Sequence, residues 1–349
     1  MSLNGPLSQR PPRSSVSLTL AVVVLLVVAG VAVAGTAAYY ELNPKSPSPG
    51  PNSVTVVDDL GRTVVAPIDP TRVVVLAPSI MDIVYRLGLR SDVVAVGCTP
   101  TIVGGILDEY SFNQTVLWNL TNSDCVTDFP SLNTEAVAAL STQLVLASTL
   151  TSAQAVATLT QTYGIPVVLL APSTLEGVVG DVRIASSIFP QAASAATALV
   201  SNLAQTLSNA SAYVQNLSES GFTSPSVLLT YYFDSGGYYS YSAGSFGDSL
   251  ISFAGGTNVA AGIAVVYGEV NASYVFDQQP DLIIYPTSWN DPYLVDDETP
   301  AVWNGSAPYW SQLMGAKVGV DVTILTEADP TMILALPTLQ AIVLASSGS

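Results

Sequence analysis

The chain has 349 residues, of which 26 are acidic and 9 are basic, so its formal net charge at pH 7 is −17. Such an acidic surface repels phosphate backbones and argues against a nucleic-acid partner. The chain contains no histidine, which excludes Ser/His/Asp catalysis and disfavours a direct Zn²⁺ or Mn²⁺ site. Two explanations of the missing histidine stay open: an exterior exposed to strong acid, or compositional drift.

The N-terminus carries an apolar segment, residues 16–38, that has no charge and is long enough to span a bilayer. Arg10 and Arg13 precede it, so the positive-inside rule predicts a cytoplasmic segment over residues 1–15 and an extracellular remainder. A retained anchor is favoured by the length of the segment, and a cleaved signal peptide is the alternative. The Pro/Ser-rich residues 41–53 predict a semi-stiff tether. We therefore expect a single-pass protein of the cell membrane with its folded part outside the cell.

An exported chain exposes its Asn-x-Ser/Thr sequons to glycosylation. The six sequons begin at Asn113, Asn119, Asn209, Asn216, Asn271 and Asn304. Chance is the competing explanation in a chain rich in Asn, Ser and Thr. Cys98 and Cys125 are the only cysteines, and an oxidising exterior favours one disulfide between them over two free buried thiols.

Between residues 54 and 189, apolar strands alternate with helices. Strands are predicted at residues 73–77, 93–96, 144–147 and 167–170, and helices at residues 80–87, 134–140 and 152–163. Ser79 with Asp82 has the spacing of a capping box, and Asn133 is placed to cap the second helix. Strands and helices that alternate at this spacing predict βαβ units and a largely parallel sheet, the N-terminal lobe.

The pattern then changes to one uninterrupted helical stripe over residues 191–217, which predicts a connecting helix within residues 190–220, about 40 Å long at 1.5 Å per residue. Residues 221–349 return to an α/β pattern and predict a C-terminal lobe. Its expected elements are strands at residues 227–233, 281–285 and 318–325, a helix from Ser245 to Gly255, and a closing helix at residues 332–345. Two lobes flanking one helix predict a cleft between them, which is a favoured place for a ligand.

Several short motifs follow one another in a set order. They include Asp58-Asp59-Leu60-Gly61-Arg62, the run from Arg72 to Ser79, Pro130 to Glu135, Gly244-Ser245-Phe246 and Pro280 to Ile284. In order and spacing the chain resembles the extracytoplasmic solute-binding proteins of ABC importers for ferric siderophores and cobalamin. The resemblance implies an α/β fold of two Rossmann-like lobes joined by one long helix, with little hinge motion. It also implies a monomer that captures a bulky metal chelate, performs no chemistry on it, holds no cofactor, and delivers it to an ABC permease and its ATPase.

The same resemblance implies that one exposed glutamate on each lobe docks on the permease. Glu135 matches the first position, although a glutamate there also suits a helix N-terminus. The second position is occupied by Ser273, and Glu269 lies four residues earlier. We therefore expect Glu135 and Glu269 to be the docking residues, and Ser273 departs from the family pattern at the second position.

Loops at the strand ends that face the cleft are the expected source of ligand contacts. Aromatic rings with polar tips line a broad apolar cleft and still donate hydrogen bonds, although core packing is the simpler explanation for any single ring. The expected ligand-binding residues are Pro78, Ser79, Trp118, Phe129, Tyr238, Tyr239, Tyr241, Phe246, Trp289 and Tyr293. These loops carry no arginine cluster, so a neutral or weakly charged chelate, a hydroxamate complex or a corrinoid, is favoured over a catecholate.

Three other functions stay open. Direct Fe³⁺ capture by Tyr231, Tyr232 and Asp234 is disfavoured because adjacent residues of a strand point to opposite faces. An exported glycosidase-like enzyme could use the carboxylates of residues 296–298, which also fit a solvated acidic loop. A surface adhesion protein is the third option.

Overall fold

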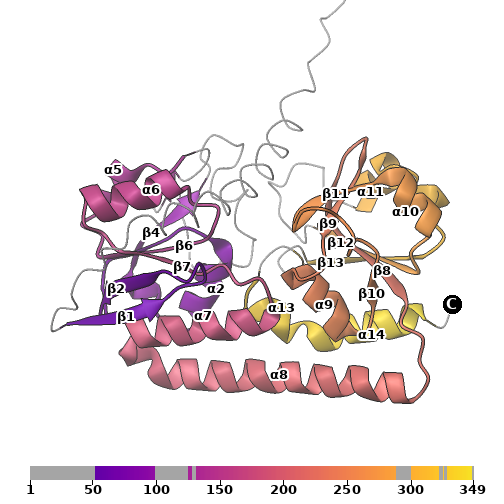
Figure 1. The fold of residues 1–349 in the computed structure, drawn as a ribbon, viewed down its shortest axis with the longest axis horizontal. Helices are drawn as coiled ribbons and strands as arrows, with labels where there is room; N and C mark the ends of the chain where they lie inside the picture. Colours follow the sequence, from indigo (N-terminus) through magenta and orange to yellow (C-terminus); the bar gives the residue numbers. More distant parts are fainter. Residues whose placement is uncertain are drawn as a thin grey trace, which may run out of the picture.

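The computed structural model describes residues 52–98, 125–127, 131–287, 300–321, 325 and 328–347. Over these residues the chain forms two α/β lobes that stand side by side on a base of helices (Figure 1). The predicted two-lobed α/β fold is confirmed. The predicted anchor (residues 16–38) and the predicted tether up to residue 51 lie outside the described residues, and the last tether residue, Ser53, already belongs to the first strand. None of the described helices is both long and apolar enough to cross a membrane.

The N-terminal lobe is built on a five-stranded parallel sheet with the strand order β5-β4-β3-β6-β7. Its strands are β3 (Val73–Val75), β4 (Val93–Cys98), β5 (Cys125–Thr127), β6 (Leu144–Ala147) and β7 (Val167–Leu169), and the antiparallel pair β1 (Ser53–Val57) and β2 (Thr63–Pro67) precedes them. Every residue of β3 and β6 is buried, which explains why these strands are continuous apolar runs rather than alternating ones.

Helices cover this sheet and carry most of the predicted capping. They are α2 (Pro78–Arg86), α5 (Thr134–Ala139), α6 (Ala153–Ala157), which continues as a π-helical turn over residues 158–162, and α7 (Leu175–Ile188). Asn133 caps α5 as predicted, since its Oδ1 accepts the N–H of Ala136 at 2.9 Å. The capping box predicted for α2 is wrong: the N-cap is Ala77, without a side-chain bond. Helix α7 was not predicted.

Helix α8 (Ala193–Glu219) confirms the predicted connecting helix and runs beneath both lobes (Figure 1). Its buried residues, Ala196, Leu199, Leu203, Leu207 and Ala210, recur at intervals of three or four and therefore form one stripe. Against that stripe pack α7 from the N-terminal lobe and α9, α13 and α14 from the C-terminal half.

The C-terminal lobe has a mixed sheet with the order β11-β9-β8-β12-β13, and β10 pairs with the start of β8. Its strands are β8 (Ser226–Phe233), β9 (Gly237–Tyr241), β10 (Thr257–Asn258), β11 (Tyr267–Asn271), β12 (Leu282–Thr287) and β13 (Ala316–Asp321). Its helices are α9 (Phe246–Ala254), α10 (Ala272–Gln278), α11 (Pro300–Ser306), α13 (Pro330–Leu334) and α14 (Leu336–Ser346). The single closing helix predicted at residues 332–345 is wrong, because a second helix starts at Leu336 with Pro337 in its first turn.

One apolar core extends through both lobes. It includes Ile83 and Val178 of the N-terminal lobe, Leu203 of α8, and Leu229 and Met332 of the C-terminal half, each at most 1% exposed. Because this core is contiguous, the base helices are shared structure and the lobes are not two independent domains.

A polar contact joins the lobes at the same place. The Asp82 carboxylate on α2 accepts the Nε–H of Arg86 at 2.8 Å and both the backbone N–H and the hydroxyl of Thr331 on α13, each at 3.1 Å. Arg86 in turn donates to the Thr331 hydroxyl at 3.0 Å. Asp82 is 8% exposed, so its loss leaves a half-buried cation and an N–H group without their acceptor.

Asp82→Ala is expected to lower the free energy of unfolding by about 1–3 kcal/mol, because these donors lose a charged acceptor. Asp277→Ala, on the exposed side of α10, is the matched control and should change stability by less than about 0.5 kcal/mol. Urea unfolding followed by circular dichroism measures both. Equal effects of the two substitutions contradict a stabilising contact between the lobes.

A second buried carboxyl group belongs to Asp181 of α7, which lies next to Asp59 in the turn that connects β1 to β2. Burial, the charge of Asp59 and a hydrogen bond to Asp59 together raise the pKa of Asp181 to about 9. Burial also raises the pKa of Asp59, although the backbone N–H of Ala171 and the bond to Asp181 oppose this. Asp181, 1% exposed, therefore holds a proton at neutral pH and shares it with Asp59.

In the unfolded chain Asp181 ionises near pH 4, whereas in the folded chain it does so near pH 9. The folded state thus binds one more proton across this window, and the contribution of Asp181 to stability is full below pH 4 and lost as the pH rises, by up to about 1.4 kcal/mol per pH unit. Asp181→Asn, which mimics the protonated acid, should lose less stability than the wild type between pH 5 and pH 8 in urea unfolding. Parallel pH profiles would show that this carboxyl group is not protonated in the folded protein.

Candidate functional site

In the N-terminal lobe, the candidate site lies where the order of the strands in the sheet reverses. Strands β3, β4 and β5 are added to one side, and the chain then returns to add β6 on the other side of β3. Ligands of such sheets bind beyond the carboxyl ends of the strands at this switch point. The carboxyl end of β3 leads into Pro78 and Ser79, and that of β6 leads into Ser148 and Thr149, all four half-buried.

The predicted residues Pro78 and Ser79 therefore lie at the position that the topology favours. They open α2, whose N-terminus has no side-chain cap, so its backbone N–H groups are oriented toward this edge of the sheet. Ser148 and Thr149 were not predicted. They follow a buried apolar strand directly, and that position was the available signal.

The matching edge of the C-terminal lobe is shaped by a bulge in β8. Thr230 pairs with Ser240 and Tyr232 with Tyr239, so Tyr231 is an extra residue without a partner in β9. The Thr230 hydroxyl holds the bulge by hydrogen bonds to the carbonyl groups of Tyr232 (3.0 Å) and Tyr239 (2.9 Å). The bulge overturns the simple alternation expected of adjacent tyrosines, because both Tyr231 and Tyr232 contact the ring of Tyr239.

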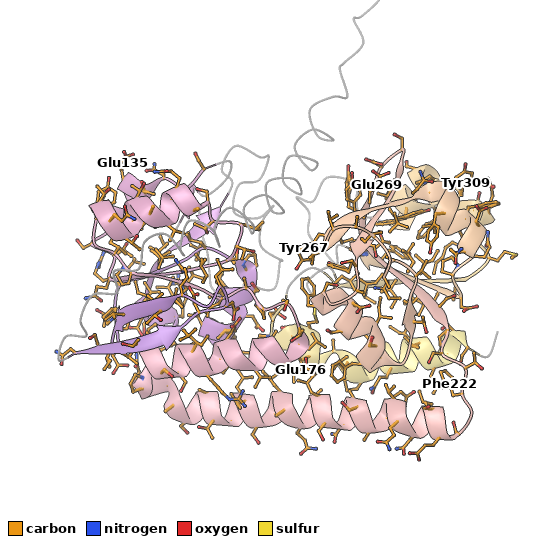
Figure 2. All side chains as sticks on the ribbon, in the orientation of Figure 1. Glu135, Glu176, Phe222, Tyr267, Glu269 and Tyr309 are labelled. Atoms are coloured by element: carbon orange, nitrogen blue, oxygen red, sulfur yellow. The ribbon has the colours of Figure 1, made fainter. Side chains whose placement is uncertain are left out.

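An aromatic cluster surrounds this bulge. The ring of Tyr241 lies 5.1 Å from Tyr231, 5.0 Å from Phe246 and 5.7 Å from Tyr267, measured between ring centroids. Tyr267 lies at the edge of the C-terminal lobe that faces the other lobe (Figure 2). The Tyr231 hydroxyl is buried and has no hydrogen-bond partner within the described part of the chain, so this cluster has one donor and acceptor to offer.

Several rings expected in a loop belong to the lobe interior instead. The segment from Phe233 to Phe246 contains strand β9 and is not a continuous loop. Tyr238, 0% exposed, donates its hydroxyl to the Pro308 carbonyl at 2.5 Å, and Tyr241, 2% exposed, donates to the Leu325 carbonyl. Tyr239 and Phe246 are also buried. These four residues pack inside the C-terminal lobe, and any contact they make with a ligand stays a prediction.

The two faces of the C-terminal sheet carry separate sets of rings. On the face opposite to Tyr241, Tyr238 and Tyr285 pack against Trp303 and Trp310 of the segment that covers the sheet. Burial raises the pKa of Tyr285 and of Tyr238. Burial also raises the pKa of Tyr239 to about 12, with the nearby Asp234 carboxylate acting in the same direction. The tyrosine hydroxyls therefore stay neutral and serve as hydrogen-bonding groups rather than phenolates.

Two carboxylates lie next to the cluster at the tip of the β8–β9 hairpin. Asp234 accepts the N–H of Gly236 at 2.7 Å and the hydroxyl of Tyr239 at 3.2 Å. Glu269 lies opposite Tyr239 in the register of β11. Burial and the charge of the neighbouring Asp234 raise the pKa of Glu269. Two carboxylates of like charge therefore lie close together here.

The predicted docking glutamates lie on matching faces of the two lobes. Glu135 is in the first turn of α5 and is exposed, and Glu269 on β11 is exposed as well. In Figure 2 both residues lie at the top of their lobes, on the side away from α8. Ser273, the departing position, follows Asn271 in the first turn of α10.

The other predicted residues divide between described and undescribed parts of the chain. Trp118, Phe129, Trp289 and Tyr293 lie outside the described residues, as do the sequons at Asn113 and Asn119 and the carboxylates of residues 296–298. Asn209, Asn216, Asn271 and Asn304 are exposed. Cys98 and Cys125 lie on neighbouring parallel strands, where Cys125 is in register with Val96 and Cys98 with Thr127. Their disulfide and the glycans stay predictions.

Comparison with known proteins assigns the family. A family described as "Periplasmic binding protein" matches residues 73–301. The chain belongs to the periplasmic binding protein family. This confirms the resemblance to the binding proteins of ABC importers that the motif order indicated. No curated protein matches the chain.

Solved periplasmic binding proteins share the fold. An Fe³⁺-hydroxamate transport protein from Saccharomonospora viridis is 18% identical, with a TM-score of 0.60 over 82% of this chain and 98% of its own. The vitamin B12 binding protein BtuF of Vibrio cholerae is 16% identical, with a TM-score of 0.60 over 81% and 100%. The molybdate-binding MolA of Haemophilus influenzae is 16% identical, with a TM-score of 0.66 over 84% and 92%. At these identities the likeness shows the fold and leaves the ligand open.

Proposed function

We propose that this protein is the substrate-binding component of an ABC importer, which captures a bulky metal chelate outside the cell and delivers it to a membrane permease. The observation that carries the proposal is the fold itself: two α/β lobes on a shared base, in a family of periplasmic binding proteins, with Tyr267 of an aromatic cluster at the edge of the C-terminal lobe that faces the other lobe (Figure 2). The proposed ligand lies in a cleft between Ser79 and Thr149 on one side and Tyr231 and Tyr267 on the other.

A metal chelate suits these residues better than a bare metal ion. Within the described residues there is no group of three or more His, Cys, Asp or Glu side chains arranged to hold a metal ion. Aromatic rings, a free tyrosine hydroxyl and an uncapped helix N-terminus instead recognise the organic shell of a complex by stacking and hydrogen bonds. We therefore place the metal inside its own chelator and assign no catalytic role to the protein.

The direct test is a titration of the exported part of the chain, residues 52–349, with a ferric trihydroxamate, a corrinoid, haem, molybdate and free Fe³⁺. Tryptophan fluorescence and equilibrium dialysis measure binding. Saturable one-to-one binding of one chelate supports the proposal. Failure of all five to bind, together with hydrolysis of a glycoside by the same preparation, favours the enzyme alternative.

The docking residues are tested separately from ligand binding. Glu135→Ala and Glu269→Ala are expected to reduce uptake by cells or permease-containing vesicles at least about tenfold each, because each removes a carboxylate that meets a cationic group of the permease. The affinity of Glu135→Ala for the chelate in solution should stay unchanged. Glu176→Ala, a change on α7 far from both positions (Figure 2), is the control. Normal uptake by both docking variants contradicts this role.

A further inference from the structure

Within the described residues, most basic side chains lie toward one edge of the sheets. All six cations beyond residue 46 lie within the described residues: Arg62, Arg72, Arg86, Arg90, Arg183 and Lys317. Arg62 donates to the carbonyl of the first residue of β7, and Arg90 to that of the first residue of β4. Arg72 directly precedes β3. These arginines lie where the parallel strands begin, at the edge opposite to the proposed site.

Two of the remaining cations lie toward the same edge. Arg86 ends α2, and a helix that follows a parallel strand runs back toward the edge where the strands begin. It is paired with Asp82. Lys317, the second residue of β13, donates to the Leu313 carbonyl at 2.6 Å. Arg183 is exposed on α7.

Beyond residue 46 the sequence supplies no other positive charge. It contains no lysine or arginine between Arg90 and Arg183, none between Arg183 and Lys317, and none after Lys317. Every chain segment that follows the carboxyl end of β4, β5, β6, β8 or β12 falls in one of these stretches. No basic side chain close in sequence to these strand ends is therefore available to meet an anionic ligand.

Negative charge and aromatic rings occupy this edge instead. Asp234 follows the carboxyl end of β8 and lies beside Glu269, against the ring cluster of Tyr231 and Tyr239. Carboxylates without a cationic partner, placed next to ring faces, favour a positively charged group. The N-terminus of α2 opposes this preference, because it carries about half a positive charge and offers N–H donors to a polar oxygen of the ligand.

We propose that the site selects a metal chelate without net negative charge, and that a positive charge on the chelate increases its affinity. The selectivity comes from the separation of charge across the sheets, which steers cations toward the proposed cleft and repels anions from it. This inference rests on the proposed function, because it concerns the ligand of the same site. It assigns tris-catecholates, haem carboxylates and molybdate to the rejected class.

Matched pairs of chelates test the charge alone. The first pair is a ferric trihydroxamate with a free ammonium group and its N-acetylated neutral form, and the second is aquacobalamin and cyanocobalamin. A ferric tris-catecholate supplies the anion. In the pair that binds, we expect the cationic chelate to bind at least about tenfold more tightly than its neutral partner at low salt. This ratio should be smaller at high salt, and the catecholate should bind most weakly of all.

Equal affinity within the pair, or tightest binding of the catecholate, overturns the inference while leaving a chelate-binding protein. Failure of all five chelates to bind overturns the proposed function itself. The two failures are therefore distinguishable in one data set.

A charge placed at the site separates local from overall electrostatics. Ser79→Arg should lower the affinity for the cationic chelate at least about tenfold and raise the affinity for the anionic chelate, because it adds a positive charge at the carboxyl edge of β3. Ser211→Arg, on the exposed face of α8, changes the net charge equally and should have no such effect. Thermal unfolding confirms that both variants fold. An unchanged charge preference in Ser79→Arg, or an equal change in both variants, contradicts the proposal.

Discussion

The arrangement of the two lobes depends on one contiguous apolar core. Leucines of α8 provide its floor, helices α7, α9, α13 and α14 pack on that floor, and the inward faces of both sheets close it. Burial of apolar surface is the main favourable term in folding and is lost wherever the core opens. A wide separation of the lobes would expose this base to water, so the fold favours small changes in their relative position.

The shared core also fixes the positions of the strand ends around the proposed site. Sequence-distant strand ends, β3 and β6 in one lobe and β8 in the other, are held at fixed positions by a common base, with Asp82, Arg86 and Thr331 adding a polar contact between α2 and α13. Helix α2 connects the two features directly, because it begins at Pro78 in the proposed site and carries Asp82 in the contact between lobes. A preformed site would lose little conformational entropy on binding, which is consistent with the proposed capture of a solute for a permease.

Much of this fold follows from sequence patterns. The uninterrupted stripe of α8, the buried runs of β3, β4 and β6, and the caps provided by Asn133 and Ser245 were all predictable, because local chemistry determined each of them. Strand β9 was not predicted, because Tyr238, Tyr239 and Tyr241 were expected in a loop at the end of a strand. Gly237 is required in this strand: a Cβ there would come 2.1 Å from the Val270 carbonyl oxygen, so only glycine lets β11 pair with β9.

Tertiary contacts account for the other differences. Asp82 has the spacing of a capping residue but bonds instead to Thr331, which is distant in sequence, and no local rule shows that alternative. The bulge at Tyr231 likewise depends on pairing with β9, so the alternation of side chains could not be extended through it.

The low charge content fits a core held mainly by apolar contacts, and the proton shared by Asp59 and Asp181 makes one buried contact stronger in acid, in keeping with the acid-exterior explanation of the missing histidine.

Native-state hydrogen exchange of the exported part of the chain tests the shared core most directly. The account predicts that the slowest amides of β3 and β6 in one lobe and of β8 and β12 in the other exchange through the same opening, with equal free energies and equal dependence on urea. Two plateaus, with one lobe opening at lower free energy while the other stays protected, would show that the lobes fold independently and would contradict a single core.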